Sequence, residues 1–403
     1  MPGPLSHLRV LDVSRILAGP SATQMLSDLG AEVIKIERPN AGDDTRHWGP
    51  PYIKDRDGND TADSTYYLSI NRGKRSVTLD ISKPEGQKIV KDLAAKSDIF
   101  VENYKVGGLA KYGLTYDDLK ALNPSLIYCS ITGFGQDGPY ATRAGYDYMI
   151  QAMGGMMSIT GEADGRPGGG PMRVGIAIAD LTTGLYSTVA ILAAVAHRER
   201  TGEGQYIDMA LLDCATAILT NQGLNYLNTG TPPGRVGNRH PNVVPYQPFP
   251  SADGHVVIAV GNDGQFRRLC GVLGLPELAD DDRFSTNSAR VTRQPELAEL
   301  LSVPVKEKTT AEWLKILEAE GVPCGPINSI EEVFNDPQIK HRGMVVEQEH
   351  KLAGAMPMIA SPMNLSATPV DYQGAPPTLG QHTDDVLADV LELSADEIAE
   401  LRT

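Results

Sequence analysis

The stretch Leu8–Glu37, LRVLDVSRILAGPSATQMLSDLGAEVIKIE, decides the fold class of this 403-residue chain. It opens with a strand pattern at 8–14 and continues with a helix pattern at 19–30, which has Pro20 in its first turn and a glycine at its end. A second strand pattern follows at 31–37. Strands that alternate with helices in this way are typical of a mostly parallel sheet covered by helices.

The same alternation continues along the first half of the chain. Further strand or strand–helix patterns lie at 75–81, 98–103, 125–135 and 204–220, with a helix pattern at 83–96. A Pro/Gly-rich stretch at 228–250 then indicates a boundary. We predict an α/β protein with a Rossmann-like large domain over 1–225, to which the segment 330–403 returns, and a smaller α/β domain over 226–329.

Composition excludes several classes of function. The formal net charge of −15 argues against nucleic acid or an anionic membrane as the main partner. The four cysteines are far apart and form no CxxC pair, and the eight histidines form no close pair, so we expect no metal site and a reducing, cytoplasmic environment. The longest apolar run, 185–196, is too short to span a bilayer.

One carboxylate raises a specific question. In the segment 173–196, Val174, Ile176 and Ile178 alternate as in a strand, a helix pattern follows, and Asp180 stands at the joint. Asp180 could cap the helix by accepting backbone N–H bonds. It could also serve as a nucleophile, because N–H donors and the helix dipole would keep its carboxylate ionised. The two roles are compatible, and the residues alone leave both open.

Two other patterns suggest a ligand site. Arg38 ends one strand, and Arg72, Lys74 and Arg75 lie close to another, so these cations either hold a phosphate or form a solvated surface. The glycines between 133 and 175 either let the backbone approach a ligand or form a flexible connection. A GxGxxG fingerprint is missing after the first strand, so a dinucleotide site is poorly supported.

Four segments together resemble a known family, the class III CoA-transferases, which also include the α-methylacyl-CoA racemases. The segments are LRVLDVSRILAGPSATQMLSDLGAEVIKIERPNAGDDTR, NRGKRSVTLD, VENYKVGGLAKYGLTYDDLKALNPSLIYCSITGFGQDGPYATRAGYDYMIQAMGG and GIAIADLTTGLYSTVAILAAVAHRERTGEGQYIDMALLD. The resemblance covers essentially the whole chain. It implies that CoA and acyl-CoA are substrates, that no cofactor is tightly bound, and that two chains form an interlocked homodimer.

The resemblance also implies roles for individual residues. Asp180 falls on the nucleophile that is acylated to a mixed anhydride and then carries CoA as a thioester. Glycines of a mobile loop that covers this aspartate fall on Gly261 and Gly264. The implied contacts of CoA are Arg38, Lys74, Arg75 and Lys111 for the phosphates, the pair Asn103 and Tyr104 beside the CoA, and Phe134 near the thioester.

Departures from the family pattern narrow the reaction. Tyr146 stands where the racemases carry a histidine base, and a phenol with a pKa near 10 abstracts an α-proton poorly. The racemases follow their aspartate with glycines, whereas Asp180 is followed by LTTG. Leu17 replaces a glutamine that is frequent in formyl- and carnitine-type transferases, which disfavours formate or oxalate as substrate.

The segment 234–249 resembles the branch that uses succinyl-CoA or related donors. Arg239 or His240 would hold the distal carboxylate, or Arg239 would only stabilise a loop or subunit contact. We therefore expect CoA transfer from a dicarboxylyl-CoA, in particular succinyl-CoA, to a carboxylic acid such as a C4–C6 dicarboxylate. The alternatives are an acyl-CoA racemase and, in another class, a CoA-binding protein without catalysis or a nucleotide-binding oxidoreductase.

Overall fold

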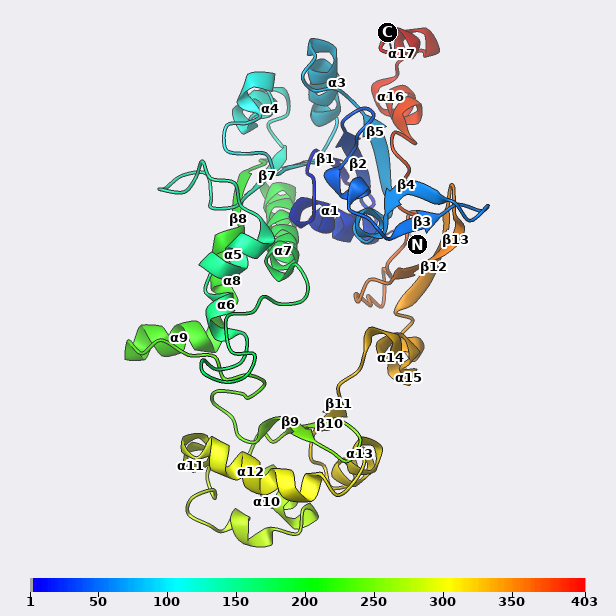
Figure 1. Cartoon of the computed structure of the whole chain (residues 1–403). Coiled ribbons are helices and arrows are strands. Elements are labelled where there is room, and N and C mark those ends of the chain that lie inside the picture. Colours follow the sequence, from blue (N-terminus) through cyan, green and yellow to red (C-terminus); the bar gives the residue numbers. More distant parts are fainter. Residues whose placement is uncertain (1–2, 403) are drawn as a thin grey trace. The chain divides into compact units, whose positions relative to one another are not determined.

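The computed structural model describes residues 3–402 and divides the chain into two compact units (Figure 1). The first unit comprises Met1–Met156, Val174–Asn228 and Lys340–Thr403, and the second comprises Met157–Arg173 and Thr229–Ile339. The sequence places 157–173 in the large domain, whereas these residues cluster with the second unit.

The first unit is built on a six-stranded sheet in which every neighbouring pair is parallel. The spatial order is β5-β2-β1-β6-β7-β8. The strands are β1 (Arg9–Asp12), β2 (Glu32–Glu37), β5 (Lys74–Thr78), β6 (Ile99–Glu102), β7 (Ile127–Thr132) and β8 (Tyr206–Ala210). The order reverses between β1 and β6, and a parallel sheet opens a ligand crevice at the carboxyl ends of its strands at such a switch point.

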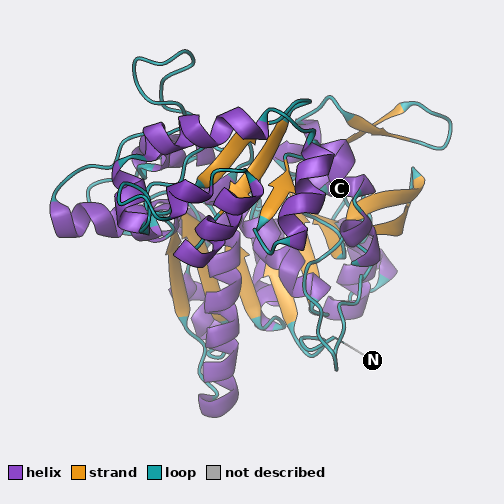
Figure 2. Ribbon diagram, turned by 90° about the horizontal axis from the view of Figure 1, so that it is seen from below, coloured by secondary structure: helices purple, strands orange, loops and turns teal. Residues whose placement is uncertain are grey.

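Helices cover both faces of this sheet, so its strands are apolar on both sides (Figure 2). Val10 of β1 lies in the core under α1, α7 and α8, while its neighbour Leu11 faces the core under α3, α4 and α16. The helices of this unit are α1 (Ala18–Asp28), α2 (Thr65–Leu68), α3 (Pro84–Ala95), α4 (Tyr116–Leu122), α5 (Asp147–Met153), α7 (Ile178–Thr201), α8 (Leu211–Ala217), α9 (Thr220–Thr229), α16 (Thr383–Leu391) and α17 (Ala395–Glu400). Short elements complete it: 3₁₀ turns η1 (Asp44–His47) and η2 (Ala110–Tyr112), and the strand pairs β3 (Tyr52–Lys54) with β4 (Asp60–Ser64) and β12 (Val345–His350) with β13 (Gly354–Ile359).

The long helix α7 packs closely against α1. A Cβ on Gly184 would lie 2.1 Å from Ser21 Oγ and 2.9 Å from Ala18 O, so this crossing accepts only glycine. By length and composition α7 could also cross a membrane, but half of its apolar window is buried inside the structure, and core helices meet the same criterion.

The C-terminal segment returns to the sheet over a separation of 300 residues or more. The N–H of His382 bonds to Ser76 O at 2.9 Å, and the N–H of Thr78 bonds to Thr383 Oγ1 at 3.1 Å. Val386 of α16 then joins the apolar core on that face. The β12–β13 hairpin of this segment was not predicted from the sequence.

The second unit has its own sheet and core. Its strands β9 (Tyr246–Pro250), β10 (His255–Ala259) and β11 (Cys324–Pro326) pair antiparallel in the order β11-β10-β9. Phe266 and Trp313 lie in the apolar core that its helices form with this sheet. The helical elements are α10 (Asp263–Val272), η3 (Pro276–Ala279), α11 (Asn287–Thr292), α12 (Gln294–Val305), α13 (Thr310–Ala319), α14 (Ile330–Asn335) and, towards the boundary, α15 (Pro337–His341); α6 (Met156–Ile159) lies at the other boundary.

Candidate active site

Two neighbouring cavities open at the carboxyl ends of the strands, where the sheet order reverses. Cavity A, of about 480 Å³, contains Asp180 and is lined by the segment after β1 and the loop after β7. Cavity B, of about 530 Å³, is lined by the segments after β2 and β5 and contains Arg38. Arg15 and Tyr104 line both cavities, which therefore adjoin.

Asp180 is the third residue of α7, in its first turn, and not a cap residue at a strand–helix joint. The predicted strand over 174–178 is wrong, because residues 174–177 are irregular and Ile178 already begins α7. Its polar groups are bonded by a side chain from α5: Gln151 accepts from Val174 N at 2.9 Å and donates to Ile176 O at 3.3 Å. With these bonds made, the segment needs no neighbouring strand.

The capping role belongs to another aspartate. Asp147, in the first turn of α5, accepts hydrogen bonds from the N–H groups of Ala179 at 2.8 Å and Asp180 at 3.2 Å. Its other oxygen accepts from Gln151 Nε2 at 2.6 Å. Since Asp147 satisfies the start of α7, the carboxylate of Asp180 is left without a hydrogen-bond partner among the described residues and is available to a substrate in cavity A.

The surroundings of Asp180 disfavour its charge. Burial, with the carboxylate of Asp147 as a second cause, raises the pKa of Asp180 to about 7. The expectation that the start of the helix would keep this group fully ionised at neutral pH is therefore wrong. Burial and then the charge of Asp180 raise the pKa of Tyr66 to about 12, so Tyr66 remains a neutral phenol near the carboxylate. A poorly solvated carboxylate is a stronger nucleophile when it does ionise.

This pKa predicts the pH dependence of the reaction. If the ionised form of Asp180 attacks, kcat/KM should rise with pH along an acid limb centred on about 7 and then level off. The measurement is a profile of kcat/KM for the acyl-CoA between about pH 5 and 9. A kcat/KM that stays level down to about pH 5 would mean that the pKa of Asp180 lies near the ordinary 3.8 and that its carboxylate is solvated during the reaction.

The loop after β7 forms one wall of cavity A. A Cβ on Gly133 would lie 2.6 Å from Cα of Gly145, so the two ends of the loop touch where it leaves and rejoins the wall. Arg143 lies on the aromatic faces of Phe134 and Tyr140, with its guanidinium carbon 5.3 Å and 4.7 Å from the ring centroids. It forms no ion pair within residues 3–402, and it lines cavity A.

Three predicted residues also reach these cavities. Leu17 is buried at the start of α1 and lines cavity A, as does the exposed Tyr146. Asn103 lines cavity A and bonds to both backbone groups of Arg15. Phe134 packs between Arg143 and the main core rather than lining the wall.

In cavity B, Arg38 is exposed and forms no ion pair within the described part of the chain. Tyr104 lines the cavity beside it, and so does Tyr112. Lys111 places its ammonium 4.7 Å from the ring centroid of Tyr112. Cavity B therefore offers the cation of Arg38 and the aromatic rings of Tyr104 and Tyr112, groups that bind phosphates and adenine, while Lys111 lies outside its lining.

The structure does not bring Lys74 and Arg75 to Arg38, and this corrects the expected phosphate cluster. Lys74 is fully buried and its ammonium lies 3.0 Å from the carboxylate of Asp12. Arg75 pairs with Glu32 at 2.6 Å and with Asp389. Both cations begin β5, whereas cavity B lies at the carboxyl ends of the strands.

Four predicted residues belong to the second unit. Arg239 lines a separate cavity of about 320 Å³ together with Arg166. His240 accepts backbone N–H bonds from residues 242 and 243 through Nδ1, which favours a loop-stabilising role. Gly261 donates to Gln265 Oε1, and Gly264 lies in the first turn of α10, which Asn262 caps. Their predicted roles as distal-carboxylate and covering-loop residues stay predictions.

Sequence reasoning missed Asp147, Tyr66 and Arg143. Asp147 and Gln151 are four residues apart and therefore share one face of α5, which was a readable signal. The sequence contains no such signal for Tyr66 and Arg143, because their approach to Asp180 depends on how distant segments pack. No group of three or more His, Cys, Asp or Glu side chains is arranged to hold a metal ion within residues 3–402.

The fold and these cavities define an α/β enzyme with its ligand site at the switch point of a parallel sheet and an unpaired carboxylate beside it. Residues 5–383 match the family described as CoA-transferase family III. The chain belongs to this family and is a CoA-transferase.

Known proteins of similar sequence and structure agree. A succinate–glutarate CoA-transferase of Agrobacterium fabrum is 52% identical over 96% of this chain and 96% of its own. A succinyl-CoA:glutarate CoA-transferase of Homo sapiens is 45% identical over 99% of this chain and 88% of its own. The crystal structure of a CAIB/BAIF family protein from Brucella suis superposes with a TM-score of 0.85 at 49% identity, covering 97% of this chain and 100% of that one.

Proposed function

We propose that this enzyme transfers CoA from succinyl-CoA to a dicarboxylic acid such as glutarate, and that Asp180 carries first the acyl group and then CoA. The observation on which the proposal rests is the free carboxylate of Asp180 in cavity A, which Asp147 relieves of capping α7. Cavity B, with Arg38 and Tyr104, would receive the nucleotide end of CoA.

The reaction then has two mirror-image halves. An oxygen of Asp180 attacks the thioester carbon and the C–S bond breaks. CoA departs as a thiolate, and the acyl group is now joined to Asp180 in a mixed anhydride. The thiolate attacks Cγ of Asp180, which releases the donor acid and forms an aspartyl-CoA thioester. The acceptor carboxylate displaces CoA from Cγ, and the thiolate attacks the acceptor's acyl carbon. Acyl-CoA leaves, and Asp180 regains its carboxylate.

The acid is proposed from two facts. The relatives that are 52% and 45% identical are named for succinate or succinyl-CoA and glutarate. In addition, cavity A contains Arg143, a cation without an ion pair among the described residues, which could receive a second carboxylate. With succinyl-CoA as donor, glutarate should be a better acceptor than the monocarboxylate of equal chain length; a preference for the monocarboxylate would contradict the proposal.

The experiment that tests the covalent route is trapping. Incubation with succinyl-CoA, followed by hydroxylamine or borohydride and peptide mass mapping, should place the adduct in the peptide that contains Asp180. CoA transfer between the two acids without any adduct at Asp180, or with an adduct on another carboxylate, would contradict the proposal. Solvent deuterium entering the α-carbon without an acceptor acid would instead indicate racemisation.

Arg38 gives a separate prediction about CoA binding. Arg38→Met should raise KM for the acyl-CoA about tenfold and leave kcat nearly unchanged, because a contact with distant phosphates is equally strong in ground state and transition state. Arg75→Met is the matched control, since Arg75 pairs with Glu32 and Asp389 and should leave KM within about twofold. Equal effects of the two substitutions on KM would contradict the assignment of cavity B.

We also propose that the chain acts as a homodimer, interlocked as in its family, in the cytoplasm. Exposed apolar side chains on α7 (Leu185 and Val189) and on α9 (Leu224 and Leu227) support a subunit interface. All four cysteines are free thiols, as suits a reducing compartment. Light scattering on the eluting protein would give twice the 43.3 kDa of one chain; a monomer would contradict this part.

A further inference from the structure

The turn between β1 and α1 adopts a backbone conformation that its sequence disfavours. Ile16 has φ of 71°, in the left-handed region, where a β-branched side chain is strained. Arg15, Ile16 and Leu17 all line cavity A with Asp180. Such strain persists only where the surroundings fix the conformation, and it gathers at functional sites.

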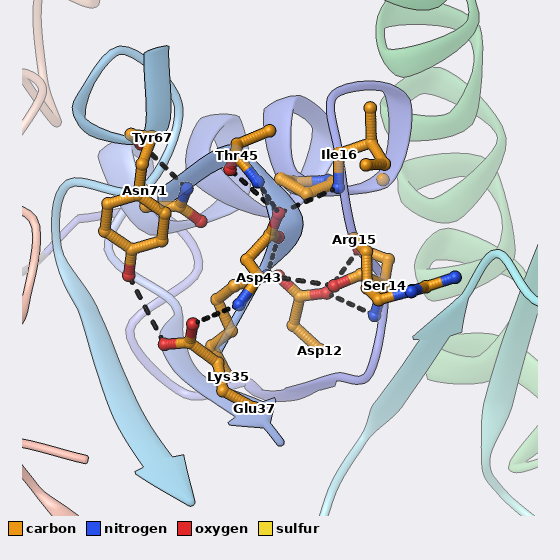
Figure 3. A network of polar contacts seen from close by, with 12 residues as sticks. Asp12, Ser14, Arg15, Ile16, Lys35, Glu37, Asp43, Thr45, Tyr67 and Asn71 are labelled. Carbon is orange, nitrogen blue, oxygen red and sulfur yellow. Dashed lines mark hydrogen bonds and ion pairs between the residues drawn. The ribbon is translucent and has the colours of Figure 1, made fainter. Parts of the chain in front are cut away.

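Buried charged groups hold the first half of this turn (Figure 3). Asp12 Oδ1 accepts from the N–H of Ser14 at 2.9 Å and from its hydroxyl at 2.5 Å. The ammonium of Lys35 donates to Ser14 O at 2.9 Å. Both polar groups of the Ser14 backbone are therefore bonded to side chains of β1 and β2.

The second half is held in the same way. Asn103 bonds to Arg15 N at 2.8 Å and Arg15 O at 2.6 Å. The N–H of Ile16 donates to Asp43 Oδ1 at 3.3 Å. Five consecutive backbone groups, from Ser14 N to Ile16 N, are thus bonded to side chains, and four of these bonds come from distant parts of the chain.

Asp43 and Lys35 are also paired with each other. Lys35 Nζ lies 3.0 Å from Asp43 Oδ2, and both side chains are fully buried. Burial works against either charge, but the partner charge keeps the pKa of Asp43 below and that of Lys35 above their ordinary values. A buried ion pair is seldom a gain in stability over apolar side chains, so its place beneath a strained turn of the active site calls for another role.

We propose that Asp43 is a positioning residue for CoA transfer: together with Lys35 it holds Ile16 in the left-handed conformation, and thereby fixes Arg15 and Leu17 in the wall of the Asp180 cavity. This inference rests on the proposed function of that cavity. Asp43 itself touches no reacting atom in the scheme above.

The variant Asp43→Asn tests the pair with little change of shape. Asp43 Oδ1 accepts from Ile16 N, Thr45 N and Thr45 Oγ1, while Oδ2 faces Lys35. An amide offers one oxygen, so in either orientation its NH₂ group faces donors. Asp43→Asn should therefore loosen the turn and lower kcat about tenfold or more.

Glycine at residue 16 separates positioning from general destabilisation. Glycine adopts φ of 71° without strain, and alanine does not. In the Asp43→Asn background, Ile16→Gly should recover at least about threefold in kcat, whereas Ile16→Ala should recover none. If Asp43 served overall stability alone, kcat per folded molecule would not fall in Asp43→Asn, and neither substitution would have a loss to recover.

The outcomes are distinct. Asp43→Asn with kcat within about twofold of the parent, or equal rescue by glycine and alanine, overturns the positioning role. If Asp43→Asn unfolds, the charge-balanced Lys35→Met/Asp43→Asn variant replaces it, with the same loss and rescue expected. Failure of the parent enzyme to acylate Asp180 would instead count against the proposed function.

Discussion

Asp180→Ala should lower kcat for CoA transfer by at least about 10⁴-fold while CoA still binds. Removing the group that forms the covalent intermediate removes the reaction path itself, and binding in cavity B does not depend on it. The measurement is the transfer rate from succinyl-CoA to glutarate, with CoA affinity determined separately by calorimetry. Exchange that survives the substitution would show that another group carries the acyl chain.

The chain contains a matched control for this substitution. Asp213 is the third residue of α8, as Asp180 is the third residue of α7, but it is exposed and lines neither cavity. Asp213→Ala removes a carboxylate from the same position of a helix and should leave kcat within about twofold. A large effect of Asp213→Ala would mean that the loss in Asp180→Ala reflects damage to a helix start.

The buried carboxyl group of Asp180 should also reduce the stability of the folded protein. The pKa of Asp180 is about 7 in the folded protein and 3.8 ordinarily. Below pH 3.8 the group is neutral in both states and does not lower the free energy of unfolding. As the pH rises from 3.8 to about 7, the free energy of unfolding falls, because the unfolded chain ionises more readily. At about pH 8, the free energy of unfolding of Asp180→Asn, measured by denaturant titration, should therefore exceed that of the parent by up to about 4 kcal/mol. Near pH 4 the two free energies should agree. A parent that is more stable at pH 8 would contradict the burial of this charge.

Asp147→Ala should lower kcat about 10²-fold and stability by about 1–2 kcal/mol. The substitution removes the bonds to the N–H groups of Ala179 and Asp180, so the first turn of α7 loses its cap and the nucleophile its fixed position. Rates and denaturant unfolding measured on the same preparation would separate the two effects.

Asp147→Asn is the control, because an amide oxygen can still accept from the N–H groups of Ala179 and Asp180, and only the bond from Gln151 Nε2 is lost. It should keep most of kcat at high pH. Since the charge of Asp147 helps to raise the pKa of Asp180, its removal should move the acid limb of kcat/KM to lower pH. An unchanged acid limb, or a loss as large as in Asp147→Ala, would contradict the assigned role.

The fold was largely readable because its sheet obeys local rules. The strands at 8–14, 31–37 and 125–135 and the helices at 19–30 and 83–96 were predicted close to their observed bounds. The segment 174–178 was misread because Val174, Ile176 and Ile178 alternate as a strand does. Alternation reports which side chains face the core, but not whether a neighbouring strand is available, and here Gln151 supplies the backbone bonds instead.

The site was readable only in part. Asp180 and Arg38 follow from the family motif and from strand ends. Lys74 carries the same charge as Arg38, yet it lies buried against Asp12, because a pairing across strands is decided by register and packing. The pair Lys35 and Asp43 has the same origin: nothing local distinguishes a buried lysine within a strand from an exposed one.

The return of α16 to β5 has a consequence for how the protein is made. The face of the sheet that holds Leu11 and Phe100 is completed by Val386, Leu387 and Val390, which are synthesised after every strand of that sheet. Until α16 is made, the part of this apolar surface that α3 and α4 do not cover stays exposed, so the first unit completes its core only after α16 has been synthesised. A chain that stops before α16 is therefore expected to leave this apolar surface exposed and to aggregate.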